Sequence, residues 1–444
     1  MPITLRPETL EKLRPEIVKY LNACEVTKGS ILEAKSGFWT LYDAEKLLPE
    51  TGPRRDAIKS YVGESSILDF MLSETRRFLD SLTYSEDETA VPLLQAIHCD
   101  DVDALADHLL NSFQSIPWRY WVTIPLPDRL AAFVRQMAPI REFSPRIRFI
   151  HDKAEIENTS PAGGMKPRSN GLFGLLGGAT EPGACLQFQV DGFVARFGRT
   201  ETLEEAKSHL RGFLGLGLAL EVFHAGSMPT IQMPRQQIHF RRIDGDDANG
   251  ASHSLTDGET ATIHSISPKL PGLLFQADTP LVSEEKMEAM AAILSNPQRH
   301  KILLRACEWL FNSHVGDDPL LNFVQATVVL EITLGDKASS DEIGLGTLLA
   351  NRCAYMIGRT TSERAEILKE FKAIYGVRSQ IVHSGKHRLT STETYQLHRL
   401  RWLGRSVIRE EVKLATEEIN REKLAAQRKI AAALAEGVNT TTAS

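Results

Sequence analysis

The chain has 444 residues, of which 42% are hydrophobic and 24% are charged, so it can bury one or more large cores and is expected to form two or three domains. Its formal net charge of −6 excludes a generally basic surface, so contact with a polyanion would have to come from a local patch. Its 5 cysteines are scattered and never form a C-x-x-C pair, which argues against a disulfide framework and against a cysteine zinc site.

The sequence lacks long apolar runs and lacks metal-ligand spacing, and these two features predict its cellular compartment and its cofactors. The first twenty residues lack the apolar run of a signal peptide, and the sequence has no stretch of about 18 consecutive apolar residues. We therefore expect a soluble, cytoplasmic protein that makes no membrane contact. The histidines show no H-E-x-x-H or similar ligand spacing, so the sequence predicts no metal and no other cofactor.

The first part of the chain has helical periodicity. Apolar residues recur every three or four positions in Ser66–Leu82 and Asp100–Phe113. These patterns predict an N-terminal helical region over residues 1–115.

The pattern changes near Pro117 and becomes a mixture of strands and helices. Asp191-Gly192 lies between two alternating runs and is interpreted as a hairpin turn, and Thr202–Phe223 as a helix whose glycines allow close packing. Further strands are expected at Trp118–Pro127, Arg146–Asp152, Gln237–Ile243 and Ala261–Ile266. The sequence thus predicts a central α+β domain over residues 116–280.

A glycine-rich segment, Ala162–Ala184, interrupts this domain. It lacks the pattern G-x-x-x-x-G-K-[ST] of a phosphate-binding loop, so a surface loop is the simpler interpretation. An enzyme site in the central region stays a third, weaker hypothesis, because its acids and histidines are dispersed.

The last part of the chain, residues 281–444, is predicted to be all-α. Strand patterns stop at a domain boundary near Ala277–Val282, and the chain ends with a charged, alanine-rich helix. The whole chain is therefore expected to be an α+β multidomain protein with a C-terminal helical bundle.

One helical segment of this bundle, Glu363–Gly385, carries the candidate chemistry. Its apolar stripe includes Arg378, whose guanidinium needs a partner if it is buried, because arginine cannot lose its charge. Glu331 is the only acid of a very apolar helix and is the candidate partner.

The spacing of the neighbouring polar residues limits which side chains can act together. Ser379 and His383 are four positions apart, so the hydroxyl could orient the imidazole. Arg378 and His383 are five positions apart, about 140° around a helix, so they converge only through the long arginine or through a second copy of the chain. Between Asn351 and Arg409 there are 12 Lys or Arg against 4 Glu and no Asp, a net of +8 that favours phosphate binding.

Three segments of this region resemble a known family. They are VVLEITLGDK (328–337), LLANRCAYMIG (348–358) and FKAIYGVRSQIVHSGK (371–386). Together they resemble the HEPN superfamily, and most closely its Apea-like branch, over roughly the last third of the chain. The resemblance implies a bundle of four or more helices, a homodimer formed through the motif helices and, in active members, a metal-independent endoribonuclease.

The resemblance also implies roles for individual residues. The family's arginine, polar residue and histidine fall on Arg378, Ser379 and His383, where many members have Asn, Asp or His in place of the serine. Glu331 and Tyr375 are expected to support them. RNA, tRNA included, is the implied substrate, and the implied role is a toxin-like effector in anti-phage or stress defence, with a trigger or ligand acting on the N-terminal regions. A non-catalytic HEPN scaffold that binds a protein or nucleotide is the alternative.

Overall fold

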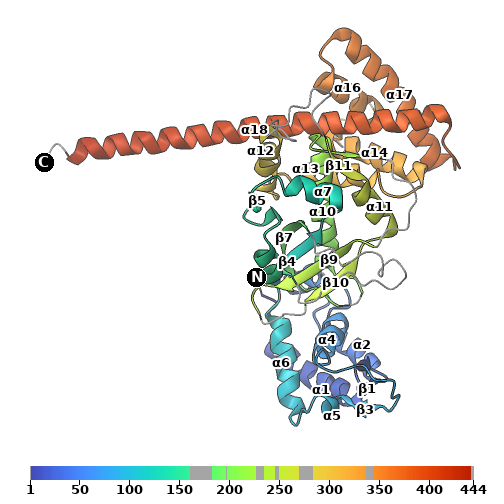
Figure 1. Cartoon of the computed structure of the whole chain (residues 1–444), viewed down its shortest axis with the longest axis vertical. Coiled ribbons are helices and arrows are strands. Elements are labelled where there is room, and N and C mark those ends of the chain that lie inside the picture. Colours follow the sequence, from blue (N-terminus) through green and yellow to red (C-terminus); the bar gives the residue numbers. More distant parts are fainter. Residues whose placement is uncertain are drawn as a thin grey trace.

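The protein is an α+β molecule with its sheets in the middle of the chain and helices at the C-terminal end (Figure 1). The computed structural model describes residues 2–160, 183–196, 198–226, 235–245, 250–269, 284–336 and 344–441, with side chains up to residue 429. The N-terminal part occupies one end of an elongated body, the larger sheet lies in the middle, and the C-terminal helices form the other end. No helix in the described part of the chain is long and apolar enough to cross a membrane.

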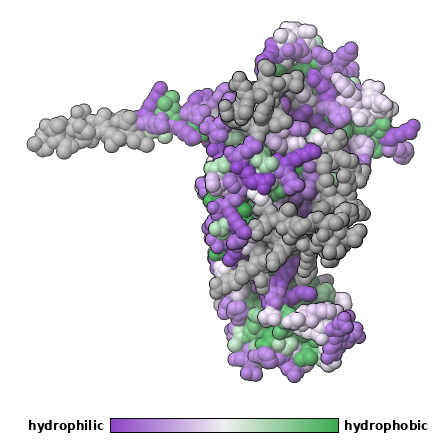
Figure 2. Space-filling model, viewed as in Figure 1, coloured by the Kyte–Doolittle hydropathy of each residue, from purple (hydrophilic) through white to green (hydrophobic). Residues whose placement is uncertain are grey.

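The N-terminal part is mostly helical, as predicted, but it also contains a small antiparallel sheet of order β2-β1-β3. Its elements are α1 (Pro7–Ala23), β1 (Glu25–Thr27), β2 (Ile31–Glu33), α2 (Gly37–Glu45), α3 (Pro53–Tyr61), α4 (Ser66–Arg77), β3 (Val91–Pro92), α5 (Leu93–Ala96) and α6 (Val102–Gln114). Apolar side chains reach the surface of this end, whereas the opposite end is mostly hydrophilic on the face shown in Figure 2.

The centre of the molecule is a six-stranded antiparallel sheet of order β10-β9-β4-β7-β6-β5. Its strands are β4 (Trp118–Pro125), β5 (Ile140–Ser144), β6 (Ile147–Ile150), β7 (Cys185–Gly192), β9 (Gln237–Arg242) and β10 (Ala251–Ser254). A second sheet pairs β8 (Phe223–Ala225) with β11 (Ile266–Pro268). The helices of this part are α7 (Asp128–Val134), α8 (Lys153–Thr159), α10 (Glu201–Ala219) and α11 (Asp257–Ser265). Phe213 of α10 packs edge-on against Phe143 and Phe149 and so joins this helix to the sheet.

Two local predictions in this part are wrong. Asp191-Gly192 is not a hairpin turn, because β7 ends there and pairs with β4 and β6, which precede it in the chain. Most of the segment Ala261–Ile266 is not a strand but the end of α11, since Thr256 and Glu259 form a capping box that starts a helix. The predicted strands at β4, β6 and β9 and the helix α10 are confirmed.

The C-terminal part is helical, as the sequence predicted. Its helices are α12 (Glu284–Leu294), α13 (Lys301–Asn312), α14 (Pro319–Leu334), α16 (Leu345–Ile357), α17 (Thr361–His383) and α18 (Ser391–Thr441). Figure 1 shows α18 crossing this end of the body and then projecting well beyond it. The glycine-rich residues 161–182 and the predicted boundary at 277–282 lie outside the described residues.

The buried residues form two large cores. One runs through the N-terminal part, the central sheet and helices α12 and α13, and the other joins α14, α16, α17 and α18. Helix α14 belongs to both, because Val329 lies in the first core while Phe323 and Leu330 lie in the second. The motif helix α17 therefore packs in the second core, and α14 and α18, which belong to both cores, connect it to the rest of the molecule.

A close helix crossing holds α13 against the central part. Helices α10 and α13 pack along each other, and a Cβ placed on Gly215 would collide with the carbonyl group of Cys307. The predicted use of these glycines for close packing is thus confirmed at this position.

We expect Gly215→Ala to lower the free energy of unfolding by about 1–3 kcal/mol, because backbone must move to admit one methyl group. Gly376→Ala in α17 is the matched control, since beyond the adjoining residues and backbone of α17 no described atom lies within 4 Å of the added Cβ. That variant should gain about 0.5–1 kcal/mol from the better helix propensity of alanine. Urea denaturation measures both, and a Gly215→Ala protein as stable as wild type would contradict the crossing.

Candidate functional site

Helix α17 places the predicted site residues at its C-terminal end. It begins with a capping box in which Thr360 accepts from the Glu363 amide and Glu363 accepts from the Thr360 amide. Its buried side chains, Ile367, Phe371, Ile374 and Val377, face α14, α16 and α18. The helix ends at His383, so the site lies where the chain leaves the bundle.

The Arg378 guanidinium faces Glu331 of α14, as the sequence predicted. Arg378 Nη2 lies 3.3 Å from Glu331 Oε1, and the two side chains are 22% and 20% exposed. Arg378 Nε and Glu331 Oε1 are both buried and have no hydrogen-bond partner in the described part of the chain. The pair is therefore held by charge at close range rather than by an aligned hydrogen bond, and the guanidinium keeps donors free.

Tyr375 completes this group one turn earlier on α17. Its ring centroid is 5.7 Å from Arg378 Cζ, a cation–π contact, and its ring stacks on that of Phe371. Partial burial raises the pKa of Tyr375, and the neighbouring Glu331 carboxylate raises it further, so the phenol is neutral at pH 7. The structure thus brings together three predicted site residues, Glu331, Tyr375 and Arg378.

The other two predicted residues are placed differently. Ser379 and His383 are both exposed, and no hydrogen bond joins them to each other or to Arg378 in the structure as described. The orienting hydrogen bond suggested by the four-residue spacing is therefore not formed. His383 is accessible to a ligand, and no hydrogen bond to a described residue orients its ring.

The basic side chains of residues 351–409 fall into two groups, those paired with acids and those that are unpaired. Several cations are neutralised by acids, among them Lys386 by Glu393 at 2.9 Å and Arg399 by Glu370 at 2.9 Å. The exposed cations that form no ion pair with a described residue are Arg359, Lys369, Lys372 and Arg388. The exposed unpaired charge of this region thus lies on α17 and beside it.

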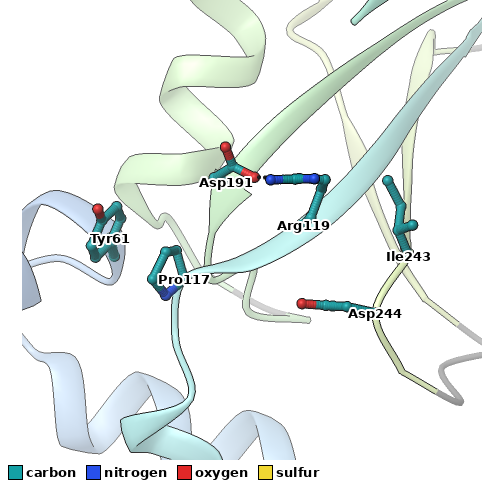
Figure 3. A pocket seen from close by; sticks show the side chains of 6 residues that line it. All are labelled: Tyr61, Pro117, Arg119, Asp191, Ile243 and Asp244. Atoms are coloured by element: carbon teal, nitrogen blue, oxygen red, sulfur yellow. Dashed lines mark hydrogen bonds and ion pairs between the residues drawn. The ribbon is translucent and has the colours of Figure 1, made fainter. Parts of the chain in front are cut away.

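A separate hollow of about 440 Å³ lies where the N-terminal part meets the sheet (Figure 3). Its lining residues are Tyr61, Pro117, Arg119, Asp191, Ile243 and Asp244. Asp191 accepts from Arg119 at 3.0 Å and from Arg146 at 2.9 Å. Burial alone would raise the pKa of Asp191, but these two arginines hold it below its usual range. The carboxylate therefore joins β7 to β4 and to the turn between β5 and β6, a role that a local pattern in the sequence cannot indicate.

The described residues contain no group of three or more His, Cys, Asp or Glu side chains that could hold a metal ion. The chain matches no protein-family model, no curated protein and no solved structure. The function is consequently inferred from the geometry of the site and from the resemblance of the motif segments.

The Glu331–Arg378 pair can be tested by a double-mutant cycle with Glu331→Gln and Arg378→Gln. Because both side chains are mostly buried, we expect a coupling free energy of about 0.5–1.5 kcal/mol in urea denaturation at pH 7. The exposed pair Glu410–Lys413, at 3.9 Å, is the control and should couple by less than about 0.3 kcal/mol. Equal coupling in the two cycles would show that Arg378 is not held by Glu331.

Proposed function

We propose that the C-terminal helices form a HEPN-type, metal-independent endoribonuclease in which Arg378 and His383 act on RNA. The observation that carries the proposal is the placement of Arg378: a partly buried guanidinium, positioned by Glu331, near the end of the helix on which His383 is exposed. The unpaired cations of the same surface favour a polyanionic substrate.

These residues suit cleavage of RNA through its own 2′-hydroxyl. A base takes the 2′ proton, the 2′ oxygen attacks the adjacent phosphorus, and the 5′ oxygen leaves with a proton from an acid. The products are a 2′,3′-cyclic phosphate and a 5′-hydroxyl. His383, as an imidazole, can act as the base or as the acid, and Arg378 can stabilise the charge that builds on the phosphoryl oxygens.

A homodimer would supply the second histidine that a single copy of the site lacks. Arg378 and His383 are five positions apart on α17, about 140° around the helix axis. Two copies of α17 packed across a twofold axis would offer two histidines, one to accept a proton and one to donate it. We therefore propose that the active form is a dimer through the motif helices.

The remainder of the chain is proposed to control this site, as in a toxin-like defence effector. Helix α14 supports this proposal because it packs in both large cores and carries Glu331 only two residues after Val329. A ligand that shifted the central part against the C-terminal bundle would therefore act directly on the partner of Arg378. The trigger is proposed to bind the first two thirds of the chain.

One observation favours a second candidate, the non-catalytic scaffold. His383 is exposed and no hydrogen bond orients it, whereas Arg378 has a structural partner in Glu331. In a scaffold, Arg378 would serve folding alone and His383 would be dispensable.

The test is to incubate purified full-length protein with total RNA and with tRNA in EDTA. Wild type should cut RNA and leave cyclic-phosphate ends, and His383→Ala and Arg378→Ala should slow cutting by about 100-fold or more. His387→Ala is the matched control, because this exposed histidine follows the motif and should leave the rate unchanged.

Circular dichroism and size-exclusion chromatography would confirm that the variants keep their fold and their oligomeric state. Cutting that survives in folded His383→Ala protein would rule out the proposed base. A folded wild type that leaves both RNA preparations intact, alone and with cell extract as a source of trigger, would favour the scaffold.

A further inference from the structure

Three arginines line one side of α18, away from the motif residues. Arg401, Arg405 and Arg409 are spaced four residues apart, so their side chains follow one another along the helix. Arg409 pairs with Glu221 at 3.3 Å, and Arg401 donates to the Ser313 carbonyl at the end of α13. Arg405, between them, forms no hydrogen bond or ion pair with any residue that the structure describes.

The two guanidiniums without an acid are also partly buried. The Nε atoms of Arg401 and Arg405 are inaccessible to solvent and lack a hydrogen-bond partner in the described structure. Burial, followed by the charge of Arg405, lowers the pKa of Arg401 to about 10. Burial also lowers the pKa of Arg405, only partly opposed by Glu221. Both side chains therefore carry a positive charge in a place that disfavours it.

His314 faces the same arginines from the turn after α13. Its Nε2 atom is buried and has no hydrogen-bond partner among the described residues. Burial, followed by the charges of Arg401, Arg405 and His398, lowers the pKa of His314 to about 3. The imidazole is thus neutral at pH 7 and offers one more unused polar atom beside two unneutralised cations.

Glu221, the acid whose charge acts on Arg405, does not balance this charge. Glu221 already serves Lys269 at 2.7 Å and Arg409 at 3.3 Å, and Lys286 donates to its backbone carbonyl at 3.3 Å. The ends of α10 and α13 contribute only partial negative charges, equivalent to about half an elementary charge each. Within the part of the chain that the structure describes, a net positive charge therefore remains at Arg401 and Arg405.

We propose that Arg401, Arg405 and His314 form an anion-binding site that takes a phosphate group, either free or at the end of a nucleotide. Guanidinium donors match phosphate oxygens in charge and in geometry, and a dianion would neutralise both arginines at once. The helix backbone at the site is packed against α14, since Gly404, which lies between the two arginines in the sequence, packs on Val329. It does not depend on the proposed ribonuclease, whose residues lie on α17 and α14.

A purely structural role for these arginines makes the opposite prediction. If they only held the ends of α10 and α13, the loss of Arg405 would destabilise the protein whether or not phosphate is present. If they form an empty anion site, Arg405→Gln removes an unneutralised charge and leaves the melting temperature in chloride unchanged or higher.

The experiment uses the full chain, thermal unfolding and isothermal titration calorimetry. Inorganic phosphate, a nucleoside 5′-monophosphate and chloride are compared at equal ionic strength and at pH 7.5. We expect phosphate or the nucleotide to raise the melting temperature by a few degrees above chloride. Arg405→Gln and Arg401→Gln should each weaken binding by about tenfold or more. Arg428→Gln, an exposed arginine farther along α18, should bind like wild type.

Each outcome decides the question. Tighter binding of the nucleotide than of free phosphate would assign the site to nucleotides, and equal binding would assign it to the phosphate group itself. The proposal is overturned if wild type responds alike to chloride and to both phosphate ligands, or if Arg405→Gln binds as tightly as wild type. Should Arg405→Gln fail to fold, Arg405→Lys keeps the charge but loses the donor fork, and it should still bind phosphate more weakly.

Discussion

The arrangement of the candidate site depends on helix α14, which packs into two cores at once. One side of this helix is buried with the central part of the molecule through Val329, and another is buried with α16, α17 and α18 through Leu330. A helix so apolar can carry an acid only where a cation meets it, and Glu331 meets Arg378. The position of the motif arginine is consequently set by one of the helices that join the bundle to the rest of the protein.

The close crossing of α10 and α13 extends this connection to the central sheet. Gly215 lets the backbones approach, and α13 then delivers Ser313 and His314 to the arginine side of α18. Packing on one side of the bundle thus fixes charged groups on another. Packed cores do not deform continuously. A displacement of the sheet would therefore move α13 and α14 as rigid units, and its size would not decrease with distance from the sheet.

The sequence predicted those features that local pattern determines. Helix α17 follows from its apolar stripe, and the Glu331–Arg378 pair follows because a very apolar helix has a single acid to offer. The predicted hairpin at Asp191 failed because alternation identifies a strand without naming its partners, which here are β4 and β6. The small N-terminal sheet was missed for a related reason, since strands of two or three residues leave no period to detect.

The arginines of α18 show the limit of counting charges. Arg378, Arg401 and Arg405 contribute equally to the excess of positive charge in the C-terminal region. Of these three, only Arg378 has an acidic partner among the described residues. A sequence cannot separate these cases, because whether an arginine is neutralised depends on which helix ends and which acids the fold brings to it. Arginine keeps its charge at any ordinary pH, so burying one without an acid costs desolvation free energy that other interactions must offset. A bound anion offsets this cost only while it is bound. The stability of this end of the molecule should therefore depend on the anions around it, and that dependence should come from α18 rather than from the motif helix α17.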